Sequence, residues 1–280
     1  MSMTIGISIG DPNGIGPEVV LKTFADSELL KVCTPIVYAH FDFVKEQAAH
    51  FDWQLPIERM HDQPKQGVLN VVDCWTESFQ PQYGEVDAKA GELSVTSLVT
   101  ATADLKKVNI NALVTAPIHK AAIQSEGFRF PGHTDYLAQA FDGDALMFLV
   151  HPGLRVALVT DHVAVKDIAR HITTDRVAQK LNAVAHSLQQ DFGIPNPRIA
   201  VLGLNPHAGD EGVIGEEEVN LLEPLLQTHQ IGKTEISGPF SADAFFGSQS
   251  YKNYDAILAM YHDQGLIPFK TLSFGEGVNF

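Results

Sequence analysis

Short apolar runs alternate with segments of helical periodicity along most of the chain. The clearest apolar runs are Thr4–Ile9, Pro35–Tyr38, Ala112–Thr115, Ala145–Val150, Arg155–Thr160, Arg198–Leu204 and Asp255–Met260. Strands that alternate with helices are typical of a mostly parallel sheet whose faces are covered by those helices. The sequence therefore predicts an α/β fold.

Two of the intervening segments, residues 91–107 and 173–193, repeat apolar positions at helical intervals. In the second segment the repeated positions are Val177, Leu181, Val184 and Leu188. Thr174 and Asp175 are typical of a helix start, and Gly193 is typical of a helix end. We expect a long helix with one buried face here.

The length of 280 residues allows one large α/β domain or two smaller ones. Gly and Pro interrupt the pattern in residues 125–135, and a second interruption lies in residues 265–270. We therefore expect a discontinuous first domain made of residues 1–130 and 266–280. The second domain is expected to span residues 131–265.

Acidic residues outnumber basic ones, giving a formal net charge of −15. A nucleic-acid surface needs a basic face to meet phosphates, so the sequence argues against a nucleic-acid partner. No apolar stretch is long enough for a membrane helix. Cys33 and Cys74 lack a metal-binding or redox spacing and are expected to be buried thiols in a reducing compartment. We expect a cytoplasmic protein that does not bind membranes.

Histidines and acids follow the predicted strands at the point where each strand ends. Asp161 and His162 follow one strand, His207 and Asp210 a second, and His262 and Asp263 a third; His119 and Lys120 follow a fourth. Ligands of open α/β sheets bind outside the carboxyl ends of the strands. The fold is therefore expected to bring several of these side chains to one edge of a sheet.

Three neutral imidazoles suit a divalent metal that keeps positions open for a substrate. His162, His207 and His262 are the candidate ligands, and the adjacent carboxylates could orient the rings. An alternative is that each histidine ends its strand in solvent without a ligand. No short motif with metal-ligand spacing is present, so this hypothesis depends on the strand assignment.

Three further segments carry candidate binding residues. The loop "GDPNGIGPEV" at 10–19 is a strand-to-helix turn that matches neither a dinucleotide nor a P-loop motif. His133, Thr134 and Asp135 precede the apolar Tyr136 and Leu137, and this cluster either contacts substrate or only starts a helix, with Thr134 or Asp135 as its N-cap. Lys270 and Asn279 lie near the end of the chain, where Lys270 could meet an anionic group.

Taken together, these motifs resemble the 4-hydroxythreonine-4-phosphate dehydrogenase family of pyridoxal phosphate biosynthesis. The matching motifs are "GDPNGIGPE" at 10–18, "TAPIHK" at 115–120, "GHTD" at 132–135, "DH" at 161–162, "LNPHAGDEG" at 204–212, "AMYHDQGLIPFK" at 259–270 and "GEGVN" at 275–279. They cover the whole chain in the family's order. Two positions differ from common family patterns. "GHTD" at 132–135 stands where many relatives have GHTE, and Asp161 precedes His162 where other residues are common.

The resemblance implies an isocitrate/isopropylmalate dehydrogenase-like fold with two α/β domains and a cleft, working as a homodimer. It assigns a divalent metal to His162, His207 and His262, with the site shared between subunits. It assigns substrate contacts to His133, Thr134, Lys270 and Asn279. The cofactor is expected to be NAD or NADP, with no binding residues identified. Imidazole ligands favour zinc or cobalt over magnesium or manganese.

The implied reaction is oxidation of the secondary alcohol of 4-phosphohydroxy-L-threonine to a 3-oxo acid, which decarboxylates to 3-amino-2-oxopropyl phosphate. Asp243, Asp263 and Lys270 are the candidate proton acceptors. The family usually extends several dozen residues beyond "GVN", so the first domain is expected to be truncated at Phe280.

Several alternatives remain open from the sequence. One is a paralogous dehydrogenase acting on a phosphorylated four-carbon sugar acid. Another is a paralogue acting on an aromatic cis-dihydrodiol carboxylate. The last two are a metal-dependent hydrolase or lyase and an inactive truncated relative.

Overall fold

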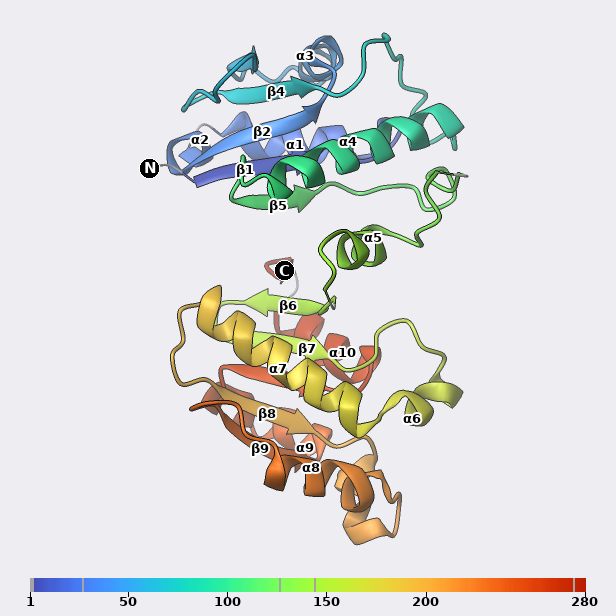
Figure 1. The fold of residues 1–280 in the computed structure, drawn as a ribbon, viewed down its shortest axis with the longest axis vertical. Coiled ribbons are helices and arrows are strands. Elements are labelled where there is room, and N and C mark those ends of the chain that lie inside the picture. The colour runs from blue at the N-terminus through green and yellow to red at the C-terminus, as the bar shows by residue number, and fades with distance from the viewer. Residues whose placement is uncertain (1–2, 27, 126, 144, 274) are drawn as a thin grey trace. The chain divides into compact units, whose positions relative to one another are not determined.

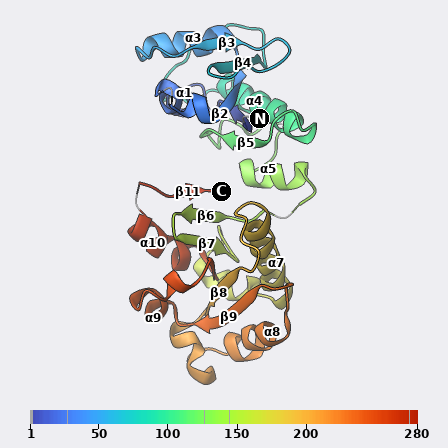
Figure 2. The ribbon, with the colours of Figure 1, turned by 90° about the vertical axis from the view of Figure 1, so that its left-hand side faces the viewer.

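The computed structural model describes residues 3–26, 28–125, 127–143, 145–273 and 275–280. The chain divides into two compact units, Met1–Ala145 and Leu146–Phe280. Each unit has its own sheet with helices on both faces, as Figures 1 and 2 show. The predicted α/β fold with two domains is therefore confirmed.

The first unit contains a five-stranded parallel sheet of order β3-β4-β2-β1-β5. Its strands are β1 (Met3–Ser8), β2 (Cys33–Ala39), β3 (Ile57–Arg59), β4 (Leu69–Asp73) and β5 (Ala112–Thr115). Its helices are α1 (Gly16–Ala25), α2 (Glu28–Val32), α3 (Phe41–His50), α4 (Ala88–Lys106) and α5 (His133–Ala140). The short strands β3 and β4 were not predicted.

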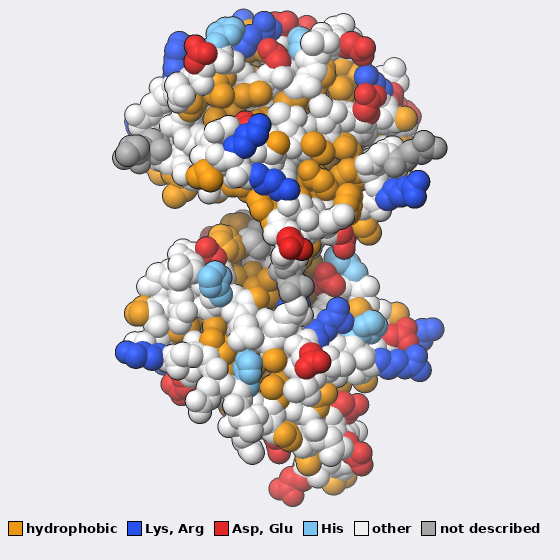
Figure 3. Space-filling view, in the orientation of Figure 1, with side chains coloured by type: hydrophobic (Ala, Val, Ile, Leu, Met, Phe, Trp, Pro, Cys, Tyr) orange, Lys and Arg blue, Asp and Glu red, His pale blue; other side chains and the backbone are white. Residues whose placement is uncertain are grey.

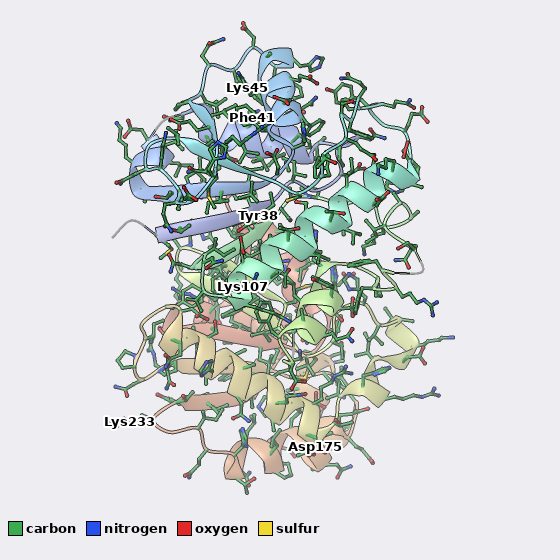
Figure 4. The ribbon with its side chains drawn as sticks, turned by 45° about the horizontal axis from the view of Figure 1, so that its top comes forward. Tyr38, Phe41, Lys45, Lys107, Asp175 and Lys233 are labelled. Atoms are coloured by element: carbon green, nitrogen blue, oxygen red, sulfur yellow. The ribbon has the colours of Figure 1, made fainter. Side chains whose placement is uncertain are left out.

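Alternating side chains of β2 separate the two faces of this sheet. Val37 packs with apolar residues of α1, α2 and α3. Its neighbour Tyr38, labelled in Figure 4, packs with Ala101 of α4 on the opposite face. The Tyr38 hydroxyl donates a hydrogen bond of 2.9 Å to Asp104 Oδ2. Because both faces are covered, the whole of β2 is buried.

The second unit contains a six-stranded sheet of order β11-β6-β7-β10-β8-β9. Its strands are β6 (Phe148–His151), β7 (Leu154–Leu158), β8 (Arg198–Leu202), β9 (Glu235–Phe240), β10 (Ala256–Ala259) and β11 (Val278–Asn279). Strands β7, β10, β8 and β9 are parallel, whereas β6 is antiparallel to β7 and β11.

Helices and helical turns connect these strands. They are η1 (Val165–Asp167), α6 (Ile168–His171), α7 (Thr174–Gln190), η2 (Pro206–Gly212), η3 (Glu218–Leu222), α8 (Glu223–Thr228), α9 (Ala242–Gly247), η4 (Ser250–Asn253) and α10 (His262–Ser273). Helix α7 confirms the predicted long helix. Its N-cap is Thr173, which lies one residue before the predicted start. The Thr173 side chain accepts a hydrogen bond from the Arg176 amide.

Strand β10 lies in the middle of the parallel part of this sheet and is buried on both faces. Leu258 packs in one core cluster with Val184 of α7, and Ile257 packs in the other with Phe269 of α10. Figure 2 shows α7 on one side of the strands and α9 and α10 on the other. Because helices cover both faces of the strand, residues 256–260 are all apolar instead of alternating with polar residues.

Residues 262–273 differ from the sequence interpretation, which placed an interruption of the pattern and a domain crossing in residues 265–270. They form helix α10, whose first turn packs directly on β7. A Cβ at Gly265 would lie 2.7 Å from Leu158 Cδ2 and 2.9 Å from Val156 Cγ1. The glycine therefore allows a close helix-to-sheet contact rather than a turn.

The domain boundaries also differ from the expected ones. Residues 266–280 lie in the second unit, because α10 packs on β7 and β10 while β11 pairs with β6. The division between units falls after Ala145 rather than at residue 130. No helix in the described part of the chain is long and apolar enough to cross a membrane.

We predict that Gly265→Val destabilises the second unit by about 1–3 kcal/mol, because new methyl groups must displace Leu158 and Val156 in a packed core. The measurement is the free energy of unfolding in urea. Gly247→Val is the matched control, since a Cβ at Gly247 meets no atom within 4 Å. Equal stability of the two variants would contradict the packing role of Gly265.

Candidate active site

Three parallel strands of the second sheet, β7, β10 and β8, are direct neighbours in that order. His162, His262 and His207 follow these strands within a few residues of their carboxyl ends. Adjacent parallel strands end at the same edge of a sheet, so the topology brings all three segments to one edge. This arrangement is the one that the strand assignment predicted.

His162 and His262 lie close together. Their ring centroids are 6.1 Å apart, and both line a cavity of about 280 Å³ with Asp161 and Asp263. His262 Nδ1 donates a hydrogen bond of 2.8 Å to Asp263 Oδ1, which fixes the ring and leaves Nε2 available to a ligand. His162 Nδ1 lies 3.5 Å from Asp161 Oδ2.

His207 lines a different cavity of about 650 Å³, together with Asp243 and Ser241. Tyr261 and Asp263 line both cavities, so the cavities adjoin. Among the residues that the structure describes, no group of three or more His, Cys, Asp or Glu side chains converges on one metal position. The single chain thus brings two of the three candidate ligands together and leaves His207 apart.

Asp161 and Asp243 both have a lowered pKa. Burial of Asp161 raises its pKa, but the hydrogen bond from the His162 amide and the charge of the His162 ring together outweigh that effect. The Ser241 hydroxyl, which donates to Asp243 Oδ1, lowers the pKa of Asp243, and the Ala244 amide and His207 lower it further. Both groups therefore remain carboxylates near neutral pH.

Gln264 ties two of the strand ends together. Its Oε1 accepts a hydrogen bond of 2.7 Å from the Met260 amide, and its Nε2 donates one of 2.6 Å to the Gly203 carbonyl. Met260 ends the apolar run of β10 and Gly203 follows β8. The Gln264 side chain therefore sets the spacing between the segments that carry His262 and His207.

The segment that carries His207 has an unusual backbone. Residues 207–211 all have positive φ, with values of 53°, 51°, 82°, 47° and 55°. The left-handed conformation costs about 1–2 kcal/mol for each non-glycine residue, and only Gly209 among these is a glycine. Surrounding contacts must therefore hold this turn in place.

The proposed substrate-contact residues belong to both units. His133 and Thr134 begin α5 of the first unit, whereas Lys270 lies on α10 and Asn279 on β11 of the second. Lys270, Asn279 and Thr134 are exposed. His133 Nε2 is buried and has no hydrogen-bond partner among the described residues, and burial lowers the pKa of this imidazole. His133 is therefore a buried, mostly neutral imidazole whose Nε2 lacks a partner among the described residues.

The glycines of the first loop serve backbone packing. A Cβ at Gly10 would lie 2.3 Å from the carbonyl oxygen of Pro117. A Cβ at Gly16 would lie 2.4 Å from the carbonyl oxygen of Ile9. The Asp11 amide donates a hydrogen bond of 2.8 Å to the same Pro117 oxygen. These contacts explain the glycines without a bound phosphate, in agreement with the absence of a dinucleotide motif.

Sequence reasoning did not identify four residues that shape the site: Asn205, Glu218, Ser241 and Gln264. Asn205 lies in "NPHAG", two residues before His207, and Gln264 lies in "YHDQG", two residues after His262. Their positions beside the histidines could have identified them. Glu218 lies in an acidic run that reads as a solvated surface, and it is fully buried. Only the fold reveals its contacts.

The fold and the site define a two-unit α/β protein with a sheet edge rich in histidine and aspartate in its second unit. The chain belongs to the family of the pyridoxal phosphate biosynthetic protein PdxA, whose family model matches residues 31–280. This match covers the segments of all three candidate histidines as well as α5, α10 and β11.

Individual relatives agree with this membership. A 4-hydroxythreonine-4-phosphate dehydrogenase of Bacteroides thetaiotaomicron is 42% identical over 99% of this chain and 77% of the relative. The crystal structure of the Klebsiella pneumoniae 4-hydroxythreonine-4-phosphate dehydrogenase matches with a TM-score of 0.84 and 30% identity, over 98% of this chain and 84% of that one. A terephthalate 1,2-cis-dihydrodiol dehydrogenase from Burkholderia xenovorans matches with a TM-score of 0.68 and 27% identity, over 97% and 83%.

We predict that Gln264→Leu lowers the free energy of unfolding by about 1–3 kcal/mol or more, because the Met260 amide and Gly203 carbonyl lose their partner. Urea unfolding measures the change, and hydrogen exchange at the Met260 amide localises it. Gln227→Leu on the exposed side of α8 is the control and is expected to be neutral. Unchanged protection of Met260 would refute the proposed bridge.

Proposed function

We propose that this chain is an NAD-linked dehydrogenase of pyridoxal phosphate biosynthesis that oxidises the secondary alcohol of 4-phosphohydroxy-L-threonine. A hydride passes from the alcohol carbon to NAD, the hydroxyl proton passes to a base, and the 3-oxo acid loses CO₂ to give 3-amino-2-oxopropyl phosphate. The observation that carries this proposal is the alignment of β7, β10 and β8, which brings the family's histidine motifs to one sheet edge.

The donor set at this edge fits a divalent metal. Two imidazoles are already within reach of each other, and carboxylates orient their rings as usually seen for metal-binding histidines. His162, His207 and His262 would hold the ion, with zinc or cobalt favoured over magnesium or manganese. When bound, such an ion supplies Lewis-acid stabilisation of negative charge on the substrate oxygen.

The position of His207 supports a site shared between two copies of the chain. His207 is exposed and lines a cavity separate from that of His162 and His262. A homodimer in which one copy supplies His162 and His262 and the other supplies His207 would complete the ligand set. This arrangement explains why a single chain holds only part of it.

The remaining groups bind and orient the substrate and accept its proton. Lys270, Asn279, Thr134 and the neutral His133 are proposed to contact the substrate, with Lys270 compensating for anionic charge in an acidic chain. Asp243 and Asp263 line the cavity of His207 and are the proposed bases. The lowered pKa of Asp243 keeps this carboxylate ionised at neutral pH.

We predict that the protein with NAD and a divalent metal forms reduced cofactor on addition of 4-phosphohydroxy-L-threonine, with His207→Ala lowering kcat by at least about a hundredfold. Absorbance of the reduced cofactor measures turnover. His186→Ala, an exposed residue on α7, is the control. Turnover of an aromatic cis-dihydrodiol carboxylate instead of the phosphorylated substrate would transfer the assignment to the dihydrodiol dehydrogenases. Full activity of His207→Ala would refute the metal assignment.

A second prediction tests the shared site. Mixed dimers of His162→Ala and His207→Ala contain one intact site if the ligands come from two copies, because each variant supplies what the other lacks. Co-expression should then restore about a quarter of the wild-type activity, although each variant alone is inactive.

The control is co-expression of His162→Ala with His262→Ala, which leaves every shared site short of one ligand. No recovery in the first mixture would contradict this arrangement, because it would show that His162 and His207 act from the same chain.

A further inference from the structure

Glu218 is a fully buried acidic residue beside the left-handed turn that presents His207. Its Oε1 accepts a hydrogen bond of 2.8 Å from the Asn205 amide, and its Oε2 accepts another of 2.8 Å from Asn205 Nδ2. Asn205 Nδ2 also donates to Glu217 Oε2 at 2.7 Å. A single asparagine, two residues before His207, is therefore bound by two carboxylates.

The backbone of the turn is closely fitted to this pair. A Cβ on Gly209 would lie 2.7 Å from Glu218 Oε2, and one on Gly203 would lie 3.1 Å from Oε1. A Cβ on Gly215 would lie 2.2 Å from Asn205 Nδ2. Glycine backbone thus surrounds the Glu218–Asn205 pair, and the side chains fill the inside of the turn.

Most acidic residues of this segment are unlike Glu218. In Figure 3 acidic side chains gather at the lower edge of the view, where Figure 1 places the segment between β8 and α8. Asp210, Glu211 and Glu216 are exposed. Glu218 alone in this run has less than 1% of its surface exposed, so solvation does not account for its position.

We propose that Glu218 is a positioning residue for the metal-binding imidazole of His207. The carboxylate holds Asn205 through both its backbone amide and its side chain, and so keeps residues 207–211 in the left-handed conformation. Without that bond the turn relaxes toward ordinary backbone angles, and His207 loses the direction needed to complete the ligand set. This inference rests on the proposed function, because it takes His207 as a ligand.

Glu218→Gln tests the role with almost no change in volume. The new amide can still accept from the Asn205 backbone, but its NH₂ group faces the NH₂ group of Asn205. Rotating the Asn205 amide does not help, since its oxygen would then face the Glu217 carboxylate. The double variant Glu217→Gln/Glu218→Gln removes this conflict, because both glutamines can donate to a rotated Asn205 oxygen.

The experiment measures binding of Co²⁺ to the metal-free full chain by its visible absorption and by calorimetry. Glu218→Gln is expected to weaken Co²⁺ binding about ten- to a hundredfold and to change the absorption spectrum, as loss of a partner behind a ligand does. The double variant is expected to recover the wild-type spectrum and most of the affinity. Glu216→Gln is the control and should behave as wild type, because the exposed Glu216 carboxylate accepts a hydrogen bond from the exposed Asn220 side chain rather than from Asn205.

Gly209→Ala disturbs the same contact from the turn and keeps the test open if Glu218→Gln does not fold. Its expected result is the same loss of Co²⁺ affinity. Wild-type affinity and spectrum in a folded Glu218→Gln or Gly209→Ala protein would overturn the proposal, as would failure of the double variant to recover. His207→Ala separates the two hypotheses: wild-type Co²⁺ binding by that variant would refute the proposed metal site itself.

Discussion

The parallel pairing of β10 between β7 and β8 is the constraint on which the candidate site depends. Leu258 aligns with Ala157 on one side and Val201 on the other, so the three strands end at one edge. Burial of β10 on both faces fixes this register, because a shift by one residue would exchange the side chains that face α7 and α10. The three histidines need no local motif, since the sheet aligns the segments that carry them.

Hydrophobic packing alone does not place the side chains beyond the strand ends. Polar contacts do so: Gln264 joins the ends of β10 and β8, and Glu218 holds the turn after β8 through Asn205. Buried hydrogen bonds offset the conformational free-energy cost of the positive φ angles in the left-handed turn. The strained segment that carries His207 thus lies against a buried, hydrogen-bonded support.

The sequence predicted the parts of this protein that depend on local periodicity. Apolar runs located β7, β8 and β10, and the spacing of Val177, Leu181 and Val184 located α7. Residues 262–273 were misjudged because Gly265 and Pro268 normally interrupt helices, whereas here Gly265 permits close packing on the sheet. The resulting helix α10 keeps the chain in the second unit, and the expected domain boundaries differ for that reason.

The candidate site was predictable in its residue types but not in its supports. Strand endings identified His162 and His262, which the fold brings within 6.1 Å. No pattern could identify Glu218, because its burial results from contacts with Asn205, Gly203 and Gly209, which a linear reading does not show. The separation of His207 from the other two rings is likewise a property of three-dimensional structure.

The central claim is that one metal ion binds the imidazoles of all three strand-end segments. X-ray absorption spectroscopy of the zinc-loaded protein tests it most directly, because outer-shell scattering counts imidazole ligands. We expect three imidazoles per zinc in the wild-type protein and two in His207→Ala. Two imidazoles or fewer in the wild-type spectrum, or an unchanged count in His207→Ala, would contradict it.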